Sequence, residues 1–115
     1  MVLCIDDEPT VLASRSLVLQ SAGYEVVTAP GGREGLQMFG ALPIDAVVLD
    51  YLMPDLKGDA VAAEMKRLNP AVPIVMLSAL TILPEGALKC VDATVTKGEH
   101  PTVLLNTLRE LLAKN

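Results

Sequence analysis

The sequence predicts one α/β domain built on a doubly wound parallel sheet, and three observations lead to this fold class. Short apolar runs alternate with helix-length amphipathic stretches along the whole chain. Most of these runs are apolar at nearly every position, which is typical of strands that helices cover on both faces. Hydrophobic residues make up 51% of the 115 residues, which suits the single core of one domain. We therefore expect residues 1–115 to form one (βα)5 three-layer sandwich.

The expected strands are short and rich in β-branched residues or leucine. They lie at residues 2–5, 25–28, 46–49, 73–77 and 93–96. Parallel strands joined by right-handed crossovers all end at the same edge of their sheet. In such sheets, ligands bind beyond the carboxyl ends of the strands. The polar residues that follow the strands are therefore the first candidates for a site.

Amphipathic segments between and after the strands predict helices. We expect them at residues 10–22, 32–41, 59–68, 85–89 and 101–114. Leu12 and Leu17 belong to the expected apolar face of the first helix, and Gly23 is a natural C-terminal stop. Pro101 favours the start of the last helix. The segment at residues 85–89 is unusually short for a helix.

Charge and composition exclude several classes of protein. The net charge of −5 opposes contact with a phosphate backbone, so we expect no direct binding of nucleic acid. No apolar run approaches the roughly 20 residues of a membrane span, and no secretory signal follows Met1. We therefore expect a cytoplasmic protein that does not enter the membrane. Cys4 and Cys90 lack the paired spacing of metal or redox motifs, so both are expected to pack in the core.

Polar residues follow four of the five predicted strands. They are Asp6-Asp7-Glu8, Asp50, Ser78 and Lys97. Carboxylates at one sheet edge repel each other, by about 4 kcal/mol for two unit charges 4 Å apart at an effective dielectric constant near 20. A cation must therefore compensate them. Oxygen ligands without histidine or thiolate select a hard ion, and such a set suits Mg²⁺.

Lys97 adds a second, movable positive charge to this edge. A carboxylate held between a divalent ion and an ammonium group can attack phosphorus, because phosphoryl transfer depends mainly on positioning and charge neutralisation. Asp50 is the best placed residue for this role. A single Asp at a strand end is more often a turn former or a helix cap, and Asp6 or Glu8 could cap the first helix. Polar residues at the ends of four strands nevertheless favour a functional site at this edge of the sheet.

The chain resembles the receiver domains of two-component signal transduction along nearly its whole length. The matching motifs occur in the family's order on the expected strands. They are Asp6-Asp7, Val47-Val48-Leu49-Asp50 with the following Met53-Pro54 and Gly58, Ser78-Ala79, and Lys97. The resemblance implies a flavodoxin-like parallel sheet in which the strands have the order 2-1-3-4-5.

By this resemblance, Asp50 accepts a phosphoryl group from the phosphohistidine of a sensor histidine kinase or phosphotransfer protein, in a reaction that requires Mg²⁺. Asp7, Asp50 and the backbone carbonyl of Leu52 hold the ion, and Asp6 contributes directly or through water. Phosphorylation then shifts the domain between an inactive and an active state. An output domain or a homodimer partner is also compatible with the resemblance.

The resemblance also assigns the residues around the phosphoryl group. Lys97 pairs with the phosphoryl oxygens, and the Ser78 hydroxyl and the Ala79 N–H donate to them. Leu52 and Leu80 occupy the two positions that influence attack by water on the acyl phosphate. Both side chains are apolar and cannot orient water, so we expect slow dephosphorylation.

Three features depart from the family pattern. Thr94 stands where the family usually has an aromatic residue, three positions before Lys97. Gly98 replaces the proline that usually follows this lysine, so the loop is expected to differ in shape. The stretch from Ser78 to Lys97 is a few residues shorter than usual, which trims the fourth helix. The family's output mechanism and partner choice therefore do not carry over directly.

Three alternative functions fit the sequence less well. A pseudo-receiver that binds proteins without being phosphorylated is disfavoured by the retained Asp50 and Lys97. Phosphatases of the haloacid-dehalogenase type place a second Asp two residues after the first, where this chain has Leu52. A flavin-binding role requires a hydroxyl-rich phosphate loop after the first strand, and Asp6-Asp7-Glu8 would repel a phosphate there.

Overall fold

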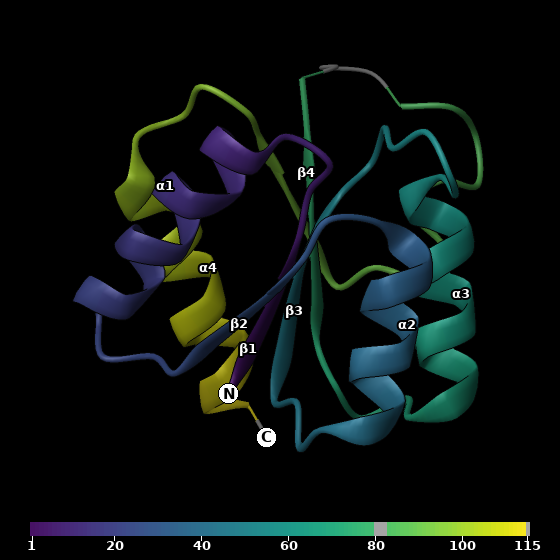
Figure 1. Cartoon of the computed structure of the whole chain (residues 1–115), viewed down its shortest axis with the longest axis horizontal. Helices are drawn as coiled ribbons and strands as arrows, with labels where there is room; N and C mark the ends of the chain where they lie inside the picture. Colours follow the sequence, from purple (N-terminus) through teal and green to yellow (C-terminus); the bar gives the residue numbers. More distant parts are fainter. Residues whose placement is uncertain (80–82, 115) are drawn as a thin grey trace.

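The computed structural model describes residues 1–79 and 83–114. Within these ranges, helices and strands alternate except between the fourth and fifth strands (Figure 1). In chain order the elements are β1 (Val2–Ile5), α1 (Pro9–Ser21), β2 (Val26–Ala29), α2 (Gly32–Ala41), β3 (Ala46–Asp50), α3 (Gly58–Leu68), β4 (Ile74–Ser78), β5 (Ala93–Thr96) and α4 (Pro101–Ala113).

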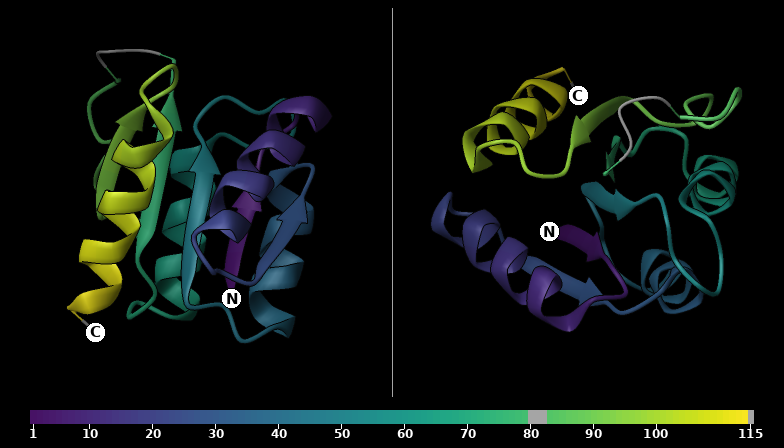
Figure 2. Two further views of the ribbon diagram at one scale, coloured as in Figure 1. Left: turned by 90° about the vertical axis from the view of Figure 1, so that its left-hand side faces the viewer. Right: turned by 90° about the horizontal axis from the view of Figure 1, so that it is seen from above.

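The five strands form one parallel sheet in the predicted order β2-β1-β3-β4-β5. The helices α1 and α4 cover one face of the sheet, and α2 and α3 cover the other, which gives the expected three layers (Figure 2). Every residue of β1, β3 and β4 is buried, in agreement with their nearly continuous apolar sequences. No helix within the described residues is long and apolar enough to cross a membrane.

Each face of the sheet has its own hydrophobic core. Leu49 packs with Phe39 and Met65 on the face covered by α2 and α3. The preceding residue, Val48, belongs to the core under α1 and α4, together with Leu108. Successive strand residues point to opposite faces, so a strand covered on both sides must be apolar at consecutive positions. Cys4 also lies in this second core, fully buried as predicted.

Local sequence signals explain the ends of α1. Pro9 occupies the first turn, where its missing N–H costs nothing. Gly23 follows the helix with a φ of +94° and donates its N–H to the Gln20 carbonyl at 2.9 Å. The prediction that Leu17 faces the core is wrong, because this side chain is 67% exposed. With 3.6 residues per turn, Leu17 lies about 140° around the helix from the buried Leu12.

The expected helix at residues 85–89 is also wrong, because residues 85–90 form turns. Gly86 has a φ of +85°, which is incompatible with a right-handed helix. So short a segment also cannot repay the cost of helix nucleation. Ala87 forms a small buried cluster with Tyr51 and Met76, and Val91 packs against this cluster, so these turns cover the sheet where a helix was expected. The predicted three-layer sandwich on a five-stranded parallel sheet is therefore confirmed, with four helices instead of five within the described residues.

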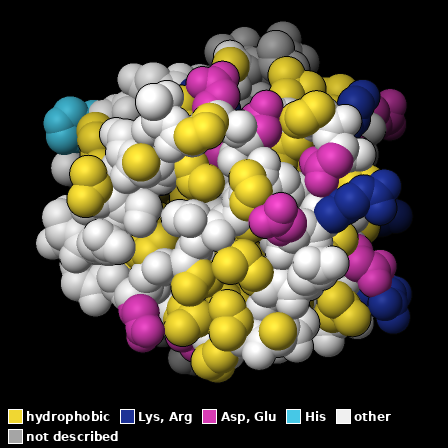
Figure 3. Space-filling view, in the orientation of Figure 1, with side chains coloured by type: hydrophobic (Ala, Val, Ile, Leu, Met, Phe, Trp, Pro, Cys, Tyr) yellow, Lys and Arg dark blue, Asp and Glu magenta, His cyan; other side chains and the backbone are white. Residues whose placement is uncertain are grey.

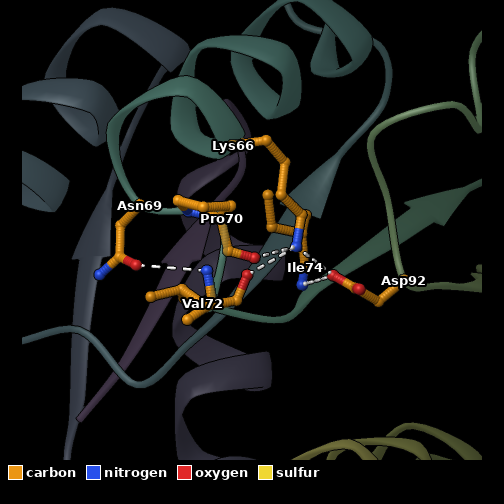
Figure 4. A network of polar contacts seen from close by, with 7 residues as sticks. Lys66, Asn69, Pro70, Val72, Ile74 and Asp92 are labelled. Atoms are coloured by element: carbon orange, nitrogen blue, oxygen red, sulfur yellow. Dashed lines mark hydrogen bonds and ion pairs between the residues drawn. The ribbon is translucent and has the colours of Figure 1, made fainter.

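A polar network joins the end of α3 to the starts of β4 and β5 (Figure 4). Lys66 Nζ lies 2.7 Å from Asp92 Oδ2 and donates to the Val72 carbonyl at 2.9 Å. The same Asp92 oxygen accepts the Ile74 N–H at 2.7 Å. The network lies at the amino ends of these strands, so it supports the sheet at the edge opposite the strand ends that carry the polar residues.

Candidate functional site

The strand ends bring three carboxylates together. One oxygen from each of Asp6, Asp7 and Asp50 lies within 4.8 Å of the others. Asp6 follows β1 and Asp50 ends β3, and these strands are neighbours in register, with Ile5 paired to Leu49. Asp6 is fully buried and Asp50 is 4% exposed, whereas Asp7 is exposed. The structure thus places in one cluster the three acidic residues that were predicted to hold the metal ion.

Lys97 lies between two of these carboxylates. Its Nζ is 2.9 Å from Asp50 Oδ1 and 3.4 Å from Asp6 Oδ2. The Lys97 N–H donates to the Ser78 carbonyl at 2.7 Å, which ties the residue after β5 to the end of β4. Gly98 follows with a φ of +93°, a conformation that glycine adopts without strain. The glycine in place of proline therefore gives this loop its own shape.

Arg15 belongs to the same site, although the sequence analysis did not identify it. Its Nη1 lies 2.9 Å from Asp6 Oδ2, and its side chain is only 11% exposed. Arg15 is three residues after Leu12 and four before Leu19, the two buried leucines of α1. The sequence signal that could have identified Arg15 is its charge on the core-facing side of α1, because a charged residue there needs a buried partner of opposite charge.

Burial and neighbouring charges give the ionisable groups different proton affinities. Burial raises the pKa of Asp50, and the charges of Asp6 and Asp7 reinforce this while Lys97 opposes it. Burial would also raise the pKa of Asp6, but a backbone N–H, Arg15 and Lys97 hold it below its usual value. Burial would lower the pKa of Lys97, but its pairing with Asp50 and Asp6 raises it. Asp50 is therefore the more basic of the two buried carboxylates, which favours it as a nucleophile.

Asp6 also has the local role of a turn former. Its Oδ1 accepts the Glu8 N–H at 3.0 Å, as Asp side chains do in tight turns. Glu8 is the N-cap residue of α1 but makes no side-chain hydrogen bond to the helix. The alternative that Glu8 caps this helix through its side chain is therefore wrong. Asp6 forms the turn with one oxygen and faces the cations with the other.

The remaining predicted residues lie at the same edge of the sheet. Ser78 ends β4 and is 4% exposed, and Ala79 follows it in an exposed bend. Leu52 lies in the loop after β3 with its side chain 51% exposed. Leu80, the other predicted neighbour of the phosphoryl group, lies outside the described residues.

Gly58 holds the loop behind the site close to β3. Its N–H donates to the Tyr51 carbonyl at 2.7 Å, so α3 starts against the end of the strand. A Cβ at this position would lie 2.6 Å from the Asp50 carbonyl oxygen and 2.8 Å from the Tyr51 Cα. Only glycine allows so close an approach, and the position of Asp50 depends on it.

The acidic cluster has the chemistry of a site for a hard divalent cation. Its three candidate ligands are carboxylate oxygens, which Mg²⁺ prefers. The nearby sulfur does not compete, because burial raises the pKa of the Cys4 thiol to about 11 and keeps it protonated. The residues present therefore fit a magnesium ion.

A groove of about 520 Å³ between α1 and α4 borders the cluster. Leu77 and Val95 of the sheet and Leu104 of α4 line it, and both cations of the site, Arg15 and Lys97, line it as well. The positive charges therefore lie on the α1 and α4 side of the carboxylates.

Comparison with known proteins assigns the family. The family model of the response regulator receiver domain matches residues 2–109. The transcriptional regulatory protein GlrR of Escherichia coli K12 is 36% identical over 85 residues, which are 74% of this chain and 19% of that protein. The probable transcriptional regulator ycf27 of Cyanophora paradoxa is 37% identical over 120 residues, covering 98% of this chain and 48% of that protein. The chain thus spans between a fifth and a half of the length of these relatives.

Comparison with solved structures supports the same family. A CheY-like receiver domain protein from Methanospirillum hungatei superposes with a TM-score of 0.92 at 26% identity, covering 98% of this chain and 93% of that one. The response regulator TrrA of Thermotoga maritima, solved in complex with Mg²⁺ and BeF, has a TM-score of 0.91 at 31% identity, covering 96% of each chain. With the fold and the motif order in agreement, this chain belongs to the family of response regulator receiver domains of two-component systems.

Proposed function

We propose that Asp50 accepts a phosphoryl group in a reaction that depends on Mg²⁺ held by Asp7, Asp50 and the Leu52 carbonyl, with Asp6 supporting the site. The observation that carries this proposal is the contact of Lys97 with Asp50 Oδ1 at 2.9 Å inside a cluster of three carboxylates. A nearly buried carboxylate with a raised pKa, between acidic metal ligands and an ammonium group, is arranged for nucleophilic attack on phosphorus.

The phosphoryl donor in this proposal is the phosphohistidine of a sensor histidine kinase or a phosphotransfer protein. An oxygen of Asp50 forms a bond to phosphorus while the phosphorus–nitrogen bond of the donor breaks. The departing imidazole keeps the electron pair and takes up a proton. The bound magnesium ion supplies neutralisation of the phosphoryl charge.

The chain's own residues then hold the product. Lys97 moves from the Asp50 carboxylate to a phosphoryl oxygen, and the Ser78 hydroxyl and the Ala79 N–H donate to the others. Ser78 and Lys97 are already tied together by a backbone hydrogen bond of 2.7 Å. Movement of the Lys97 side chain changes the surface next to the ends of β4 and β5, and an output domain or a second copy senses phosphorylation there.

Incubation with acetyl phosphate and Mg²⁺, followed by intact mass measurement, tests this function. The wild type should gain the mass of one phosphoryl group, and Asp50→Asn should gain none. Asp45→Asn is the matched control, because Asp45 directly precedes the start of the same strand and pairs with the N-terminal amine. A folded wild type that gains no phosphoryl group with Mg²⁺ would favour the pseudo-receiver alternative. An Asp50→Asn variant that is still modified would rule out Asp50 as the acceptor.

A further inference from the structure

Arg15 places a permanent positive charge inside the acidic cluster. Its side chain is 89% removed from solvent, and its Nη1 is 2.9 Å from the fully buried Asp6 Oδ2. A guanidinium group stays protonated at all accessible pH values. Unlike Lys97, which reaches the cluster from the loop after β5, Arg15 projects from the middle of a packed helix. Its charge is therefore a fixed part of the site.

Asp6 has both of its oxygens occupied by donors. Oδ1 accepts the Glu8 N–H at 3.0 Å, and Oδ2 contacts Arg15 at 2.9 Å and Lys97 at 3.4 Å. A cation that approached Asp6 directly would have to displace one of these donors and lie close to a like charge. The direct ligands should therefore come from Asp7, which is exposed, and from Asp50.

The charges of the cluster show what Arg15 does. Asp6, Asp7 and Asp50 contribute three negative charges, and Lys97 and Arg15 contribute two positive charges. Without Arg15, the excess negative charge that faces a divalent ion would be twice as large. Attraction between charges a few ångströms apart is strong at the effective dielectric constant of a protein surface site.

We propose that Arg15 is a positioning residue that limits the affinity of the site for Mg²⁺, by holding Asp6 in an ion pair and neutralising part of the cluster. This inference rests on the metal binding in the proposed function. The negative charge of the site is therefore partly neutralised before Mg²⁺ binds. Mg²⁺ then binds only at a higher concentration than the three carboxylates would otherwise require.

A purely structural role for Arg15 leads to the opposite expectation. If Arg15 only supported the packing of α1, its loss would disturb Asp6 and weaken metal binding or leave it unchanged. If it acts as a counter-charge, its loss must tighten metal binding. The direction of the change in affinity therefore separates the two roles.

The experiment is a calorimetric titration of the purified chain with MgCl₂. Arg15→Met keeps much of the side-chain volume without the charge, and it should lower the Kd for Mg²⁺ about tenfold or more. Arg15→Lys keeps the charge and should stay within about threefold of wild type. The matched control is Arg67→Met, which removes the charge of an exposed arginine on α3 paired with Glu64. It should change the Kd by no more than about twofold, because exposed charges are screened by salt.

The position of the control on the molecule supports its use. The Lys and Arg side chains visible on one face gather along its right-hand edge, over α2 and α3 (Figure 3). Arg15, by contrast, lies on α1, on the opposite face of the sheet (Figure 2). The two substitutions change the net charge equally, so a difference between them reports the position of the charge.

Equal or weaker Mg²⁺ binding by folded Arg15→Met would overturn the proposal. If Arg15→Met does not fold, Arg15→Gln takes its place with the same expected tightening, because it also removes the charge. Wild-type protein and Asp7→Asn are titrated beside these variants. If wild type does not bind Mg²⁺, or if Asp7→Asn binds it as wild type does, the metal site of the proposed function fails. If wild type binds normally and loss of the Arg15 charge does not tighten binding, only the role of Arg15 fails.

Discussion

Replacement of Gly58 by alanine tests how the loop behind the site positions Asp50. The added Cβ would lie 2.6 Å from the Asp50 carbonyl oxygen and 2.8 Å from the Tyr51 Cα, and real Cβ atoms essentially never come within 3.0 Å of such atoms. Both neighbours are backbone atoms, so relief requires α3 and the end of β3 to separate by several tenths of an ångström. Overpacking of this kind costs about 1 to 3 kcal/mol of unfolding free energy.

The matched control is Gly40→Ala. Gly40 is an exposed residue near the end of α2, and a Cβ there would meet nothing within 4 Å. The same chemical change should therefore stabilise the protein by about 0.5 to 1 kcal/mol, because alanine loses less backbone entropy in a helix than glycine does. The two substitutions are thus expected to have opposite signs.

Urea denaturation followed by circular dichroism measures both effects. Gly58→Ala should lower the unfolding free energy, and in a separate thermal melt its Tm should fall by roughly 4 to 8 °C for each kcal/mol lost. It should also slow phosphorylation by acetyl phosphate at a temperature where the variant is folded, because the strained atoms belong to Asp50 and Tyr51. A Gly58→Ala protein as stable as wild type would refute the proposed close contact.

Three further substitutions test other parts of the structure. Asp55 accepts the N–H groups of Arg33 and Gly32 at the start of α2, and these hydrogen bonds, that of Arg33 most of all, hold the pKa of Asp55 below its usual value. Both carboxylate oxygens accept N–H groups, and an amide has only one acceptor oxygen, so Asp55→Asn should cost about 1 kcal/mol at pH 7. Urea denaturation at several pH values should show this deficit disappearing as the pH falls below about 4, where the Asp55 carboxylate of the folded wild type becomes protonated. Lys66→Met should lower the unfolding free energy by about 1 to 2 kcal/mol in the same assay, because the hydrogen bonds to Val72 and Asp92 are lost. Labelling by acetyl phosphate should not change. Impaired labelling would show that the two edges of the sheet are coupled. Leu52→Asn should shorten the lifetime of the phosphorylated protein, by up to about tenfold if the polar side chain orients the attacking water. Leu52→Met should not shorten it. Equal decay rates for wild type and both variants after removal of the phosphoryl donor would contradict this prediction.

The strands and their shared edge were predictable because their signals are local and repeated. A strand buried on both faces must be apolar at consecutive positions, and Val47, Val48 and Leu49 show this directly. Because β1 and β3 are parallel neighbours, Asp6 after β1 and Asp50 at the end of β3 lie close together at the same edge of the sheet. Three of the five strands were nevertheless misplaced or shortened by one residue, because strand ends depend on which hydrogen bonds the neighbouring strands complete.

The features that sequence reasoning missed depend on contacts between distant segments. Arg15 carries no motif, and its partner Asp6 is set by how α1 lies on the sheet. The segment at residues 85–89 has helix-forming residues but too few of them, and Gly86 takes a left-handed conformation instead. Leu17 was assigned to one apolar face with Leu12 by helical spacing, although its angular position on α1 directs it to solvent.

The central claim, phosphorylation of Asp50 at a magnesium-dependent site, is tested most directly by mapping the acyl phosphate. Protein labelled with acetyl phosphate and Mg²⁺ is treated with borohydride, which reduces an aspartyl phosphate to homoserine, and its peptides are then sequenced by mass spectrometry. We predict homoserine at position 50 only, in amounts that fall sharply when Mg²⁺ is chelated before labelling. Homoserine at Asp6, Asp7 or another residue, or labelling of Asp50 that is independent of Mg²⁺, would contradict the account.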